Sequence, residues 1–537
     1  MNFTKSYKDG TTPTVAIIGA GVSGICAAIQ LQRQLKLTTY AVFELEADIG
    51  GTWRSNTYPG CNSDAPSHQY SYSFAPNYEW SQKFAPQAEV LGYLKNTAKT
   101  YNIYDKVKLN HRVSKMKWQE DKNKWALHWI KTTTGEEGDF EADVVIHGTG
   151  VLRIPCIPKE FDTFKGLKWH SAQWDHSVDL TGKKVGIVGA SASGVQIIST
   201  IADKVESLEV YSRSSVYITP LLNYRYTDTW RLLFEYVPFF YTFYRALHYW
   251  VIDFTVFLYF KIAWYSILHH IFTSLVVWIH RFRLVRNREI RRKLTPDYEL
   301  GSRNIVLSNS FYPTFQKPNV TLHKDTITSI EGRTIKTADG SEKELDVLVL
   351  ATGFEWVGNF PIGYWIGRNG IDISEKWGEN PTTYYGTCVP NAPNFYLTWG
   401  PNSGILHHSQ THMLEIQVNY AINAISHMMK ENLAVLEIKQ EVADEFMRTV
   451  DRRIERVLFS TKYKPRFTNS MGKVRGFWYG GCTEFWWRLR KLHLEQFLTT
   501  PRTITAVDAK SGASSTETPI SSFATLNGHR GRETDSD

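Results

Sequence analysis

The residues best suited to bind a charged ligand form a glycine-rich turn near the N-terminus. Gly19, Gly21 and Gly24 follow a short apolar run, Val15–Ile18, and a helical pattern comes directly after them. This spacing permits a tight turn, a close approach of the backbone to a pyrophosphate, and close packing of a helix on a strand. The first amides of a helix donate hydrogen bonds to phosphates. The turn therefore predicts a dinucleotide site.

An acidic residue narrows this prediction. Glu44 lies 20 residues after Gly24, at the end of an expected second strand. A carboxylate there accepts hydrogen bonds from the hydroxyls of an unmodified ribose, which is typical of FAD or NAD sites. The alternative is a chance glycine turn, and the combination of strand, helix and acid weighs against it.

A second turn repeats the plan after the expected strand 184–188. Gly189 and Gly194 hold the outer positions, but Ser191 replaces the middle glycine. Where the first unit has an acid, Arg213 lies 19 residues past Gly194. A guanidinium pairs with a 2′-phosphate through two parallel hydrogen bonds. The alternative for Arg213 is an ordinary surface cation. Together, the two turns predict FAD at the first and NADPH at the second.

Two further patterns accompany these turns. The first is a phenylalanine, a glycine, a histidine and a tryptophan at fixed spacing, with an aspartate after them: Phe164, Gly166, His170, Trp174 and Asp175. The second follows the first turn and comprises Gly50-Gly-Thr-Trp53, Tyr58-Pro-Gly60 and Asp64. With both, the chain resembles the Baeyer–Villiger branch of the class B flavoprotein monooxygenases over residues 14–495.

The resemblance implies an activity and a set of site residues. NADPH would reduce FAD, O₂ would add to the flavin C4a, and the resulting peroxide would convert an apolar ketone to an ester or lactone. The residues implied as catalytic are Asp64, Arg303 and His170. Those implied to contact FAD, besides the first turn and Glu44, are Thr52, Trp53, Asp64, Tyr70 and Val113. For His170, a linker role between domains and a purely structural role both stay open.

One stretch departs from the family pattern. Relatives have a glycine, one residue, a lysine and the catalytic arginine, whereas this chain has Gly301-Ser-Arg303-Asn304. Strict register puts Arg303 at the lysine position, which contacts the 2′-phosphate in relatives, and Asn304 at the arginine position. Asparagine donates hydrogen bonds without charge and stabilises an anion less. Arg303 could reach the flavin, another arginine could substitute, or the oxygenation chemistry could differ.

Three other functions compete with ketone oxygenation. A flavin monooxygenase could hydroxylate a heteroatom of a lipophilic substrate, but that branch prefers tyrosine where this chain has Trp174-Asp175. A disulfide reductase needs a cysteine pair, and the five cysteines here are scattered. A membrane-associated scaffold without enzymatic activity is disfavoured by two nucleotide-binding turns.

These motifs require an α/β protein with two Rossmann-like dinucleotide-binding domains, for FAD and NADP, and a helical, aromatic-rich insert. The expected boundaries are an N-terminal extension at 1–13, an FAD domain at 14–180 and 345–498, an NADP domain at 181–222 and 296–344, the insert at 223–295, and a Ser/Thr-rich disordered tail at 499–537. Segments 146–150 and 350–354 are expected to return the chain between the domains.

The insert and the composition bear on location. Residues 262–279 contain no Asp, Glu, Lys or Arg, and a basic run follows them. We expect a helical cap over an apolar substrate cavity, with contact to a membrane surface; a membrane span is the alternative, opposed by His269 and His270. The scattered cysteines and the absence of an N-terminal apolar run predict an intracellular protein, in the cytoplasm or on the cytoplasmic face of a membrane. A net charge of +8 on 537 residues does not indicate nucleic acid.

Overall fold

The computed structural model describes residues 6–260, 264–301, 303, 305–355, 360–457 and 468–503. Its first sheet is parallel, with the order β19-β7-β1-β2-β3. Its strands are β1 (Val15–Ile18), β2 (Tyr40–Phe43), β3 (Val107–Lys108), β7 (Val144–His147) and β19 (Phe395–Leu397). The first two and β7 are wholly buried, as expected for parallel strands covered on both faces.

A second parallel sheet has the order β13-β10-β9-β17-β8. Its strands are β8 (Leu167–His170), β9 (Lys184–Val188), β10 (Ser207–Tyr211), β13 (Val320–His323) and β17 (Val347–Leu350). The predicted fold class is confirmed. The expected domain boundaries need correction, because they placed β8 and β17 in the first domain. The apolar strand β17 hydrogen-bonds to β9, and β8 extends the same sheet beyond it.

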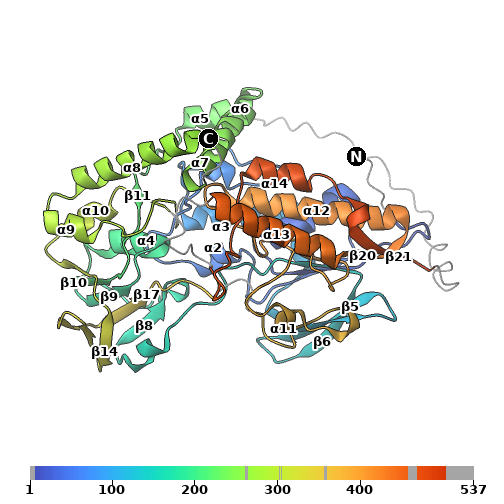
Figure 1. Cartoon of the computed structure of the whole chain (residues 1–537), viewed down its shortest axis with the longest axis horizontal. Helices are drawn as coiled ribbons and strands as arrows, with labels where there is room; N and C mark the ends of the chain where they lie inside the picture. Colours follow the sequence, from blue (N-terminus) through green and yellow to red (C-terminus); the bar gives the residue numbers. More distant parts are fainter. Residues whose placement is uncertain are drawn as a thin grey trace, which may run out of the picture.

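Helices cover the first sheet and fill the space beside it (Figure 1). Helix α1 follows β1 in the first parallel sheet, and α4 follows β9 in the second. A long C-terminal helix, α12, packs against α1. These helices are α1 (Val22–Gln30), α2 (Thr52–Ser55), α3 (Gln87–Thr100), α4 (Ala192–Ile201), α10 (Phe311–Thr314), α11 (Ile373–Trp377), α12 (Gln410–Glu431), α13 (Gln440–Val457) and α14 (Cys482–Leu489).

Smaller sheets complete the two domains. One joins β4 (His111–Gln119), β5 (Lys124–Lys131), β6 (Glu137–Ala142) and β18 (Trp365–Ile366). Another joins β14 (Ile327–Glu331), β15 (Thr334–Thr337) and β16 (Glu342–Glu344). Two pairs are β11 (Ile218–Thr219) with β12 (Val306–Leu307), and β20 (Leu433–Ile438) with β21 (Phe497–Pro501). The expected tail therefore began too early, because 499–501 complete β21; residues 504–537 lie outside the described part.

The insert is helical, as predicted, and lies along the upper edge of the view in Figure 1. It comprises α5 (Asp228–Tyr236), α6 (Phe240–Phe254), α7 (Val256–Tyr259), α8 (Trp264–Leu284) and α9 (Arg288–Lys293). Within the described residues, no helix combines the length and apolar character needed to cross a membrane. Residues 262 and 263 of the apolar stretch lie outside the described part.

Two glycines provide a matched test of how tightly the first turn packs. A methyl group on Gly24 would lie 1.8 Å from the carbonyl oxygen of Gly19, whereas one on Gly92, inside α3, would meet nothing within 4 Å. Gly24→Ala should therefore open the turn and lower the unfolding midpoint. Gly92→Ala should leave the midpoint unchanged or raise stability by about 0.5–1 kcal/mol, because alanine favours helix. Thermal unfolding followed by circular dichroism measures both; equal midpoints would contradict the packing argument.

Candidate active site

The first glycine turn is closed by backbone on two sides. Gly19 has φ +94°, and a Cβ there would lie 2.7 Å from the carbonyl oxygen of Gly148. The Gly148 amide donates to the Ile18 carbonyl at 2.8 Å. Gly21 caps α1 in an extended conformation, φ −81° and ψ −162°. The first amides of α1 therefore face a space that no side chain of the turn fills, which is the geometry that a pyrophosphate requires.

The second turn has nearly the same backbone. Gly189 has φ +100°, and its Cβ would lie 2.4 Å from the carbonyl oxygen of Ala351. Ser191 caps α4 with φ −88° and ψ −162°, close to the values at Gly21. Because this conformation lies at negative φ, serine adopts it without strain. A Cβ on Gly194 would meet the Gly189 oxygen at 2.2 Å. Serine in place of the middle glycine therefore preserves the backbone conformation of the turn.

The carboxylate of Glu44 hydrogen-bonds to the backbone of the first turn. Its carboxylate accepts hydrogen bonds from the amides of Ala20 at 2.6 Å and Glu46 at 2.9 Å. Burial raises the pKa of this carboxyl, and the two amide hydrogen bonds only partly oppose the change. At neutral pH the ionised carboxylate stands where the end of β2 meets the turn, ready to accept hydrogen bonds from ribose hydroxyls.

The stretch Gly50–Trp53 packs directly on the first turn. The Gly50 amide donates to the Ala20 carbonyl at 3.0 Å, and a Cβ on Gly51 would lie 2.8 Å from the Cα of Gly21. Thr52 opens α2, and the buried Trp53 indole N–H donates to the Tyr70 hydroxyl at 2.8 Å. The structure therefore brings Thr52, Trp53 and Tyr70 to the same side of the predicted flavin site.

Val113 lies at the edge of this group. It is buried on β4, and β4 starts beside the end of β2 because the His111 amide donates to the Glu44 carbonyl at 2.7 Å. Its predicted contact with FAD stays a prediction.

Asp64 lies beside Tyr70, and its charge also raises the pKa values of the Tyr58 hydroxyl and the Cys61 thiol, where burial is the larger cause. Although part of the Asp64 side chain is exposed, the protein around it partly desolvates the carboxyl and so raises its pKa. In the described part of the chain, no ion pair joins it to an arginine.

Arg303 does not lie next to Asp64, where the predicted catalytic role would place it. Its side chain is exposed, and its guanidinium lies 4.6 Å above the ring of Tyr298. Among described residues, neither a hydrogen bond nor an ion pair links it to Asp64. Asn304 lies outside the described residues. The structure thus leaves Arg303 on the side of the second domain, and its predicted role in catalysis stays a prediction.

His170 ends β8 and is fully buried. Its Nδ1 accepts a hydrogen bond from the Ala172 amide at 3.1 Å, and its ring meets Phe354 edge-on at 5.4 Å. Burial lowers its pKa, with the Gly353 carbonyl opposing the change, so the ring is neutral at pH 7. In register, His170 pairs with Leu350, which pairs with Val188 directly before the second turn. This position fits a residue that links the domains.

The Tyr58–Gly60 motif contacts the helix after the second turn, which sequence reasoning missed. The Tyr58 hydroxyl donates to the Gln196 side chain at 3.0 Å, and Gln196 Nε2 donates to the Asn62 carbonyl at 3.2 Å. A Cβ on Gly60 would lie 2.2 Å from the hydroxyl of Thr200. Gln196 therefore joins the helix after the second turn to the segment 58–62 of the first domain. No sequence signal marks it, because its role depends on how the domains meet.

Arg213 follows β10 and is exposed, as a 2′-phosphate ligand must be. A second cation was missed: Lys324 follows β13, the neighbouring parallel strand, so both stand at the same sheet edge. The Lys324 amine donates to the Ser215 hydroxyl at 3.0 Å, and burial lowers its pKa. A cation directly after a strand was the signal that could have found it.

A pocket opens at the end of β7. It is lined by Thr149 and Gly150 of the first return segment, by Arg153 shortly after that segment, and by the turn 399–401. Arg153 is a further exposed cation beside the flavin side of the molecule. Sequence reasoning passed over it, because it lies just outside the segment 146–150 and belongs to no motif.

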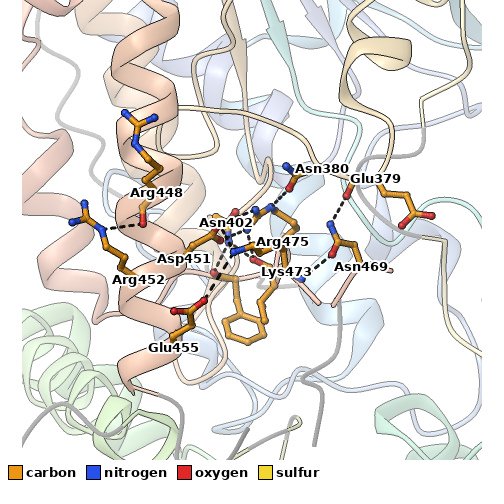
Figure 2. A network of polar contacts seen from close by, with 12 residues as sticks. Glu379, Asn380, Asn402, Arg448, Asp451, Arg452, Glu455, Asn469, Lys473 and Arg475 are labelled. Carbon is orange, nitrogen blue, oxygen red and sulfur yellow. Dashed lines mark hydrogen bonds and ion pairs between the residues drawn. The ribbon is translucent and has the colours of Figure 1, made fainter. Parts of the chain in front are cut away.

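An ion pair of the buried Arg475 with Asp451 lies next to the turn 399–402, and Figure 2 shows the polar network around it. Arg475, 2% exposed, donates to Asp451 on α13 at 2.6 Å and to Asn380 at 2.8 Å. Its carbonyl accepts the Asn402 amide at 2.8 Å. Removing one partner of a buried pair costs about 3–5 kcal/mol. The pair therefore ties α13 to the turn 399–402.

Comparison with known proteins agrees with this geometry. A family model described as flavin-binding monooxygenase-like matches residues 12–237. A Baeyer–Villiger monooxygenase of Pseudomonas aeruginosa is 32% identical over 469 residues, 86% of this chain and 87% of the relative. Another, of Streptomyces coelicolor, is 31% identical over 491 residues, 90% and 92%. The chain belongs to the Baeyer–Villiger monooxygenase family.

Solved structures of this family have the same fold. Cyclohexanone monooxygenase from Rhodococcus sp. Phi1, bound to NADP⁺, matches with a TM-score of 0.78 at 25% identity, over 91% of this chain and 99% of that one. The resemblance and the two-domain fold predicted from the sequence are confirmed.

The state of Glu44 gives this Baeyer–Villiger monooxygenase a testable pH dependence. Ribose hydroxyls donate hydrogen bonds to the ionised carboxylate, so FAD binds better when Glu44 is ionised. In the apoprotein, burial raises the pKa of Glu44 and favours the protonated carboxyl. FAD affinity of the apoprotein should increase with pH between about pH 4.5 and 7. Glu44→Gln should flatten this dependence and weaken binding about tenfold at neutral pH, because a charged acceptor is replaced by a neutral one. Flavin fluorescence titration measures the affinity, with Glu46→Gln as control; an unchanged slope in Glu44→Gln would exclude this role.

Proposed function

We propose that the chain is an FAD-dependent, NADPH-consuming Baeyer–Villiger monooxygenase that converts an apolar ketone to an ester or lactone with O₂. The proposal rests on two turns of nearly the same backbone conformation that have side chains of opposite charge beside them. The first ends on the carboxylate of Glu44, and the second faces the cations Arg213 and Lys324. Opposite charges at equivalent places distinguish an unmodified ribose from a 2′-phosphate.

The residues of the first turn fit FAD. The amides at the start of α1 would bind its pyrophosphate, Glu44 its ribose, and the Trp53–Tyr70 pair would support the ring. When bound, the flavin supplies electron transfer from NADPH and activation of O₂. The residues of the protein would orient the two nucleotides, exclude water, and place positive charge near the reacting oxygen. Asp64 would orient the arginine that provides this charge.

The substrate and the cellular location belong to the same proposal. The rings of Phe234 and Tyr241, which the insert packs against His68 of the FAD domain, support an apolar ketone as substrate. All five cysteines are free thiols, and four are buried, which supports a reducing compartment, the cytoplasm, with the insert in contact with a membrane surface. Heteroatom hydroxylation is the second candidate, favoured if Arg303 does not supply charge near the flavin.

The proposal is tested by product analysis. The purified flavoprotein, supplied with NADPH, O₂ and a panel of cyclic and linear apolar ketones, should consume NADPH faster with ketone and release an ester or lactone. Thioethers and amines are offered in parallel. Oxidation of sulfur or nitrogen without ester formation would favour the second candidate, and no ketone-dependent product would overturn the first.

Cofactor choice should depend on the two cations at the second sheet edge. Arg213→Ala should raise the KM for NADPH tenfold to a hundredfold, since one charged phosphate contact contributes about 1.5–3 kcal/mol. NADH use should change little. Lys324→Ala should add to the loss, and Arg286→Ala, on the insert, is the control. Steady-state kinetics with both nucleotides measures the effect; equal losses for NADPH and NADH would contradict the assignment.

The ratio of ester formed to NADPH consumed distinguishes two roles of Arg303. If it supplies charge at the flavin, Arg303→Ala should lower the ratio of ester formed to NADPH consumed, with oxygen released as hydrogen peroxide. If it binds the 2′-phosphate, as its place over Tyr298 favours, the KM for NADPH should rise and the ratio at saturating NADPH should stay at the wild-type value. Arg153→Ala, tested in parallel, shows whether the cation in the pocket provides the charge instead.

A further inference from the structure

The two long helices of the insert each expose an apolar stripe. On α8, Leu268, Phe272, Leu275, Trp278 and Phe282 follow each other at intervals of three or four residues, and each is at least 50% exposed. This spacing places them on one face of the helix. The face turned to the protein holds Arg281, 8% exposed, and His280, which contacts the Ser308 carbonyl at 3.0 Å. The apolar face is therefore the outer one.

The neighbouring helix α6 repeats this pattern. Phe243, Leu247, Trp250 and Phe254 form one stripe, and each is at least 49% exposed. The inner face combines the buried rings of Tyr241 and Tyr244 with polar groups. Arg245 donates to the carbonyls of Ser71 and Tyr72 at 2.8 and 3.1 Å, and Asp253 accepts the Cys482 amide at 2.7 Å. Hydrogen bonds thus fix the orientation of α6, and the exposed apolar stripe is a consequence of it.

The two stripes adjoin each other and a third helix. The ring of Phe254 lies 5.8 Å from that of His269 on α8. Asp253 also binds the start of α14, whose Trp486 and Trp487 are 48% and 59% exposed. Figure 1 shows α5, α6 and α8 along one edge of the molecule. Contiguous apolar surface of this kind marks an interaction site, since isolated exposed residues are spread evenly over ordinary surfaces.

Positive charge borders this surface. Arg283, Arg286, Arg288 and Arg292, at the end of α8 and on α9, are exposed, and in the described part of the chain no acidic side chain pairs with them. A second copy of the chain would bring a second arginine group against the first, which costs energy. A bilayer with anionic headgroups accepts both the apolar stripe and the arginines.

We propose that α6, α8 and α14 form a membrane-docking surface, which lies in the headgroup region of an anionic bilayer without crossing it. The aromatic and aliphatic side chains enter the acyl boundary, and the arginines contact lipid phosphates. Exposed apolar stripes with arginines at their border suit association with one leaflet. The inference does not depend on the reaction that the enzyme catalyses.

Vesicle binding of the full flavoprotein tests the surface. The protein should float with phosphatidylcholine vesicles that contain phosphatidylserine, more weakly with pure phosphatidylcholine, and less at high salt. Phe272→Glu/Trp278→Glu should reduce binding at least about tenfold, because charge replaces buried apolar area. The control Ile362→Glu changes a side chain that is 76% exposed, on the loop before β18, and should bind as wild type.

A second pair of variants tests the role of the exposed arginines in membrane binding. Arg283→Gln/Arg286→Gln/Arg288→Gln should weaken binding to the anionic vesicles about a hundredfold, since each basic group near the surface contributes roughly a factor of five. Arg112→Gln/Lys115→Gln/Lys117→Gln removes equal charge from β4 and should have little effect. All variants should keep the wild-type unfolding midpoint, because the changed side chains are exposed.

Three outcomes would overturn the proposal. The first is wild-type protein that floats with neither vesicle type. The second is equal binding by the stripe variant and the Ile362→Glu control. The third is a dimer in light scattering that Phe272→Glu/Trp278→Glu dissociates while no vesicle binding is seen, since a second copy would then be the occupant.

Discussion

The structure depends on one repeated constraint, the close approach of backbone at two strand–helix turns. At each turn the first glycine lies against a returning strand end, Gly148 for Gly19 and Ala351 for Gly189, and the last glycine lies against the carbonyl of the first. No side chain fits between these segments. The strand order of both sheets follows, because β7 and β17 must pair beside β1 and β9 to bring the return segments there. The open helix N-termini that bind phosphate are a product of the same packing.

The two turns work together only because other residues fix how the domains meet. Gln196 on α4 binds the Tyr58–Gly60 segment, and His170 sits at the end of β8 beside the second turn. On the far side, the Asp451–Arg475 pair holds the turn 399–402 against the pocket. These contacts lie outside the nucleotide-binding motifs, and they connect the segments that carry the two turns.

The insert follows a different physical rule from the two domains around it. Its helices bury arginine and aspartate together with a few aromatic and aliphatic side chains, and they expose long apolar stripes. Hydrogen bonds of Arg245 and Asp253 compensate for the buried charge. Composition alone showed an apolar, aromatic segment, but a buried cap and a surface for lipid have the same composition. Only the orientation of α6 and α8 separates them.

The sequence by itself determined the fold class, the two turns and their nucleotide preferences, and the family, because glycine spacing and strand-end charges are local properties of the chain. Lys324, Gln196 and the Arg475 pair were missed, and the boundaries that assigned β8 and β17 to the first domain were wrong, since each depends on pairing between segments far apart in sequence. The place of Arg303 over Tyr298, away from any ion pair with Asp64, also emerged only from the tertiary structure. Motif register states which residue type stands at a position, whereas the packing of the loop around Tyr298 decides where its charge points.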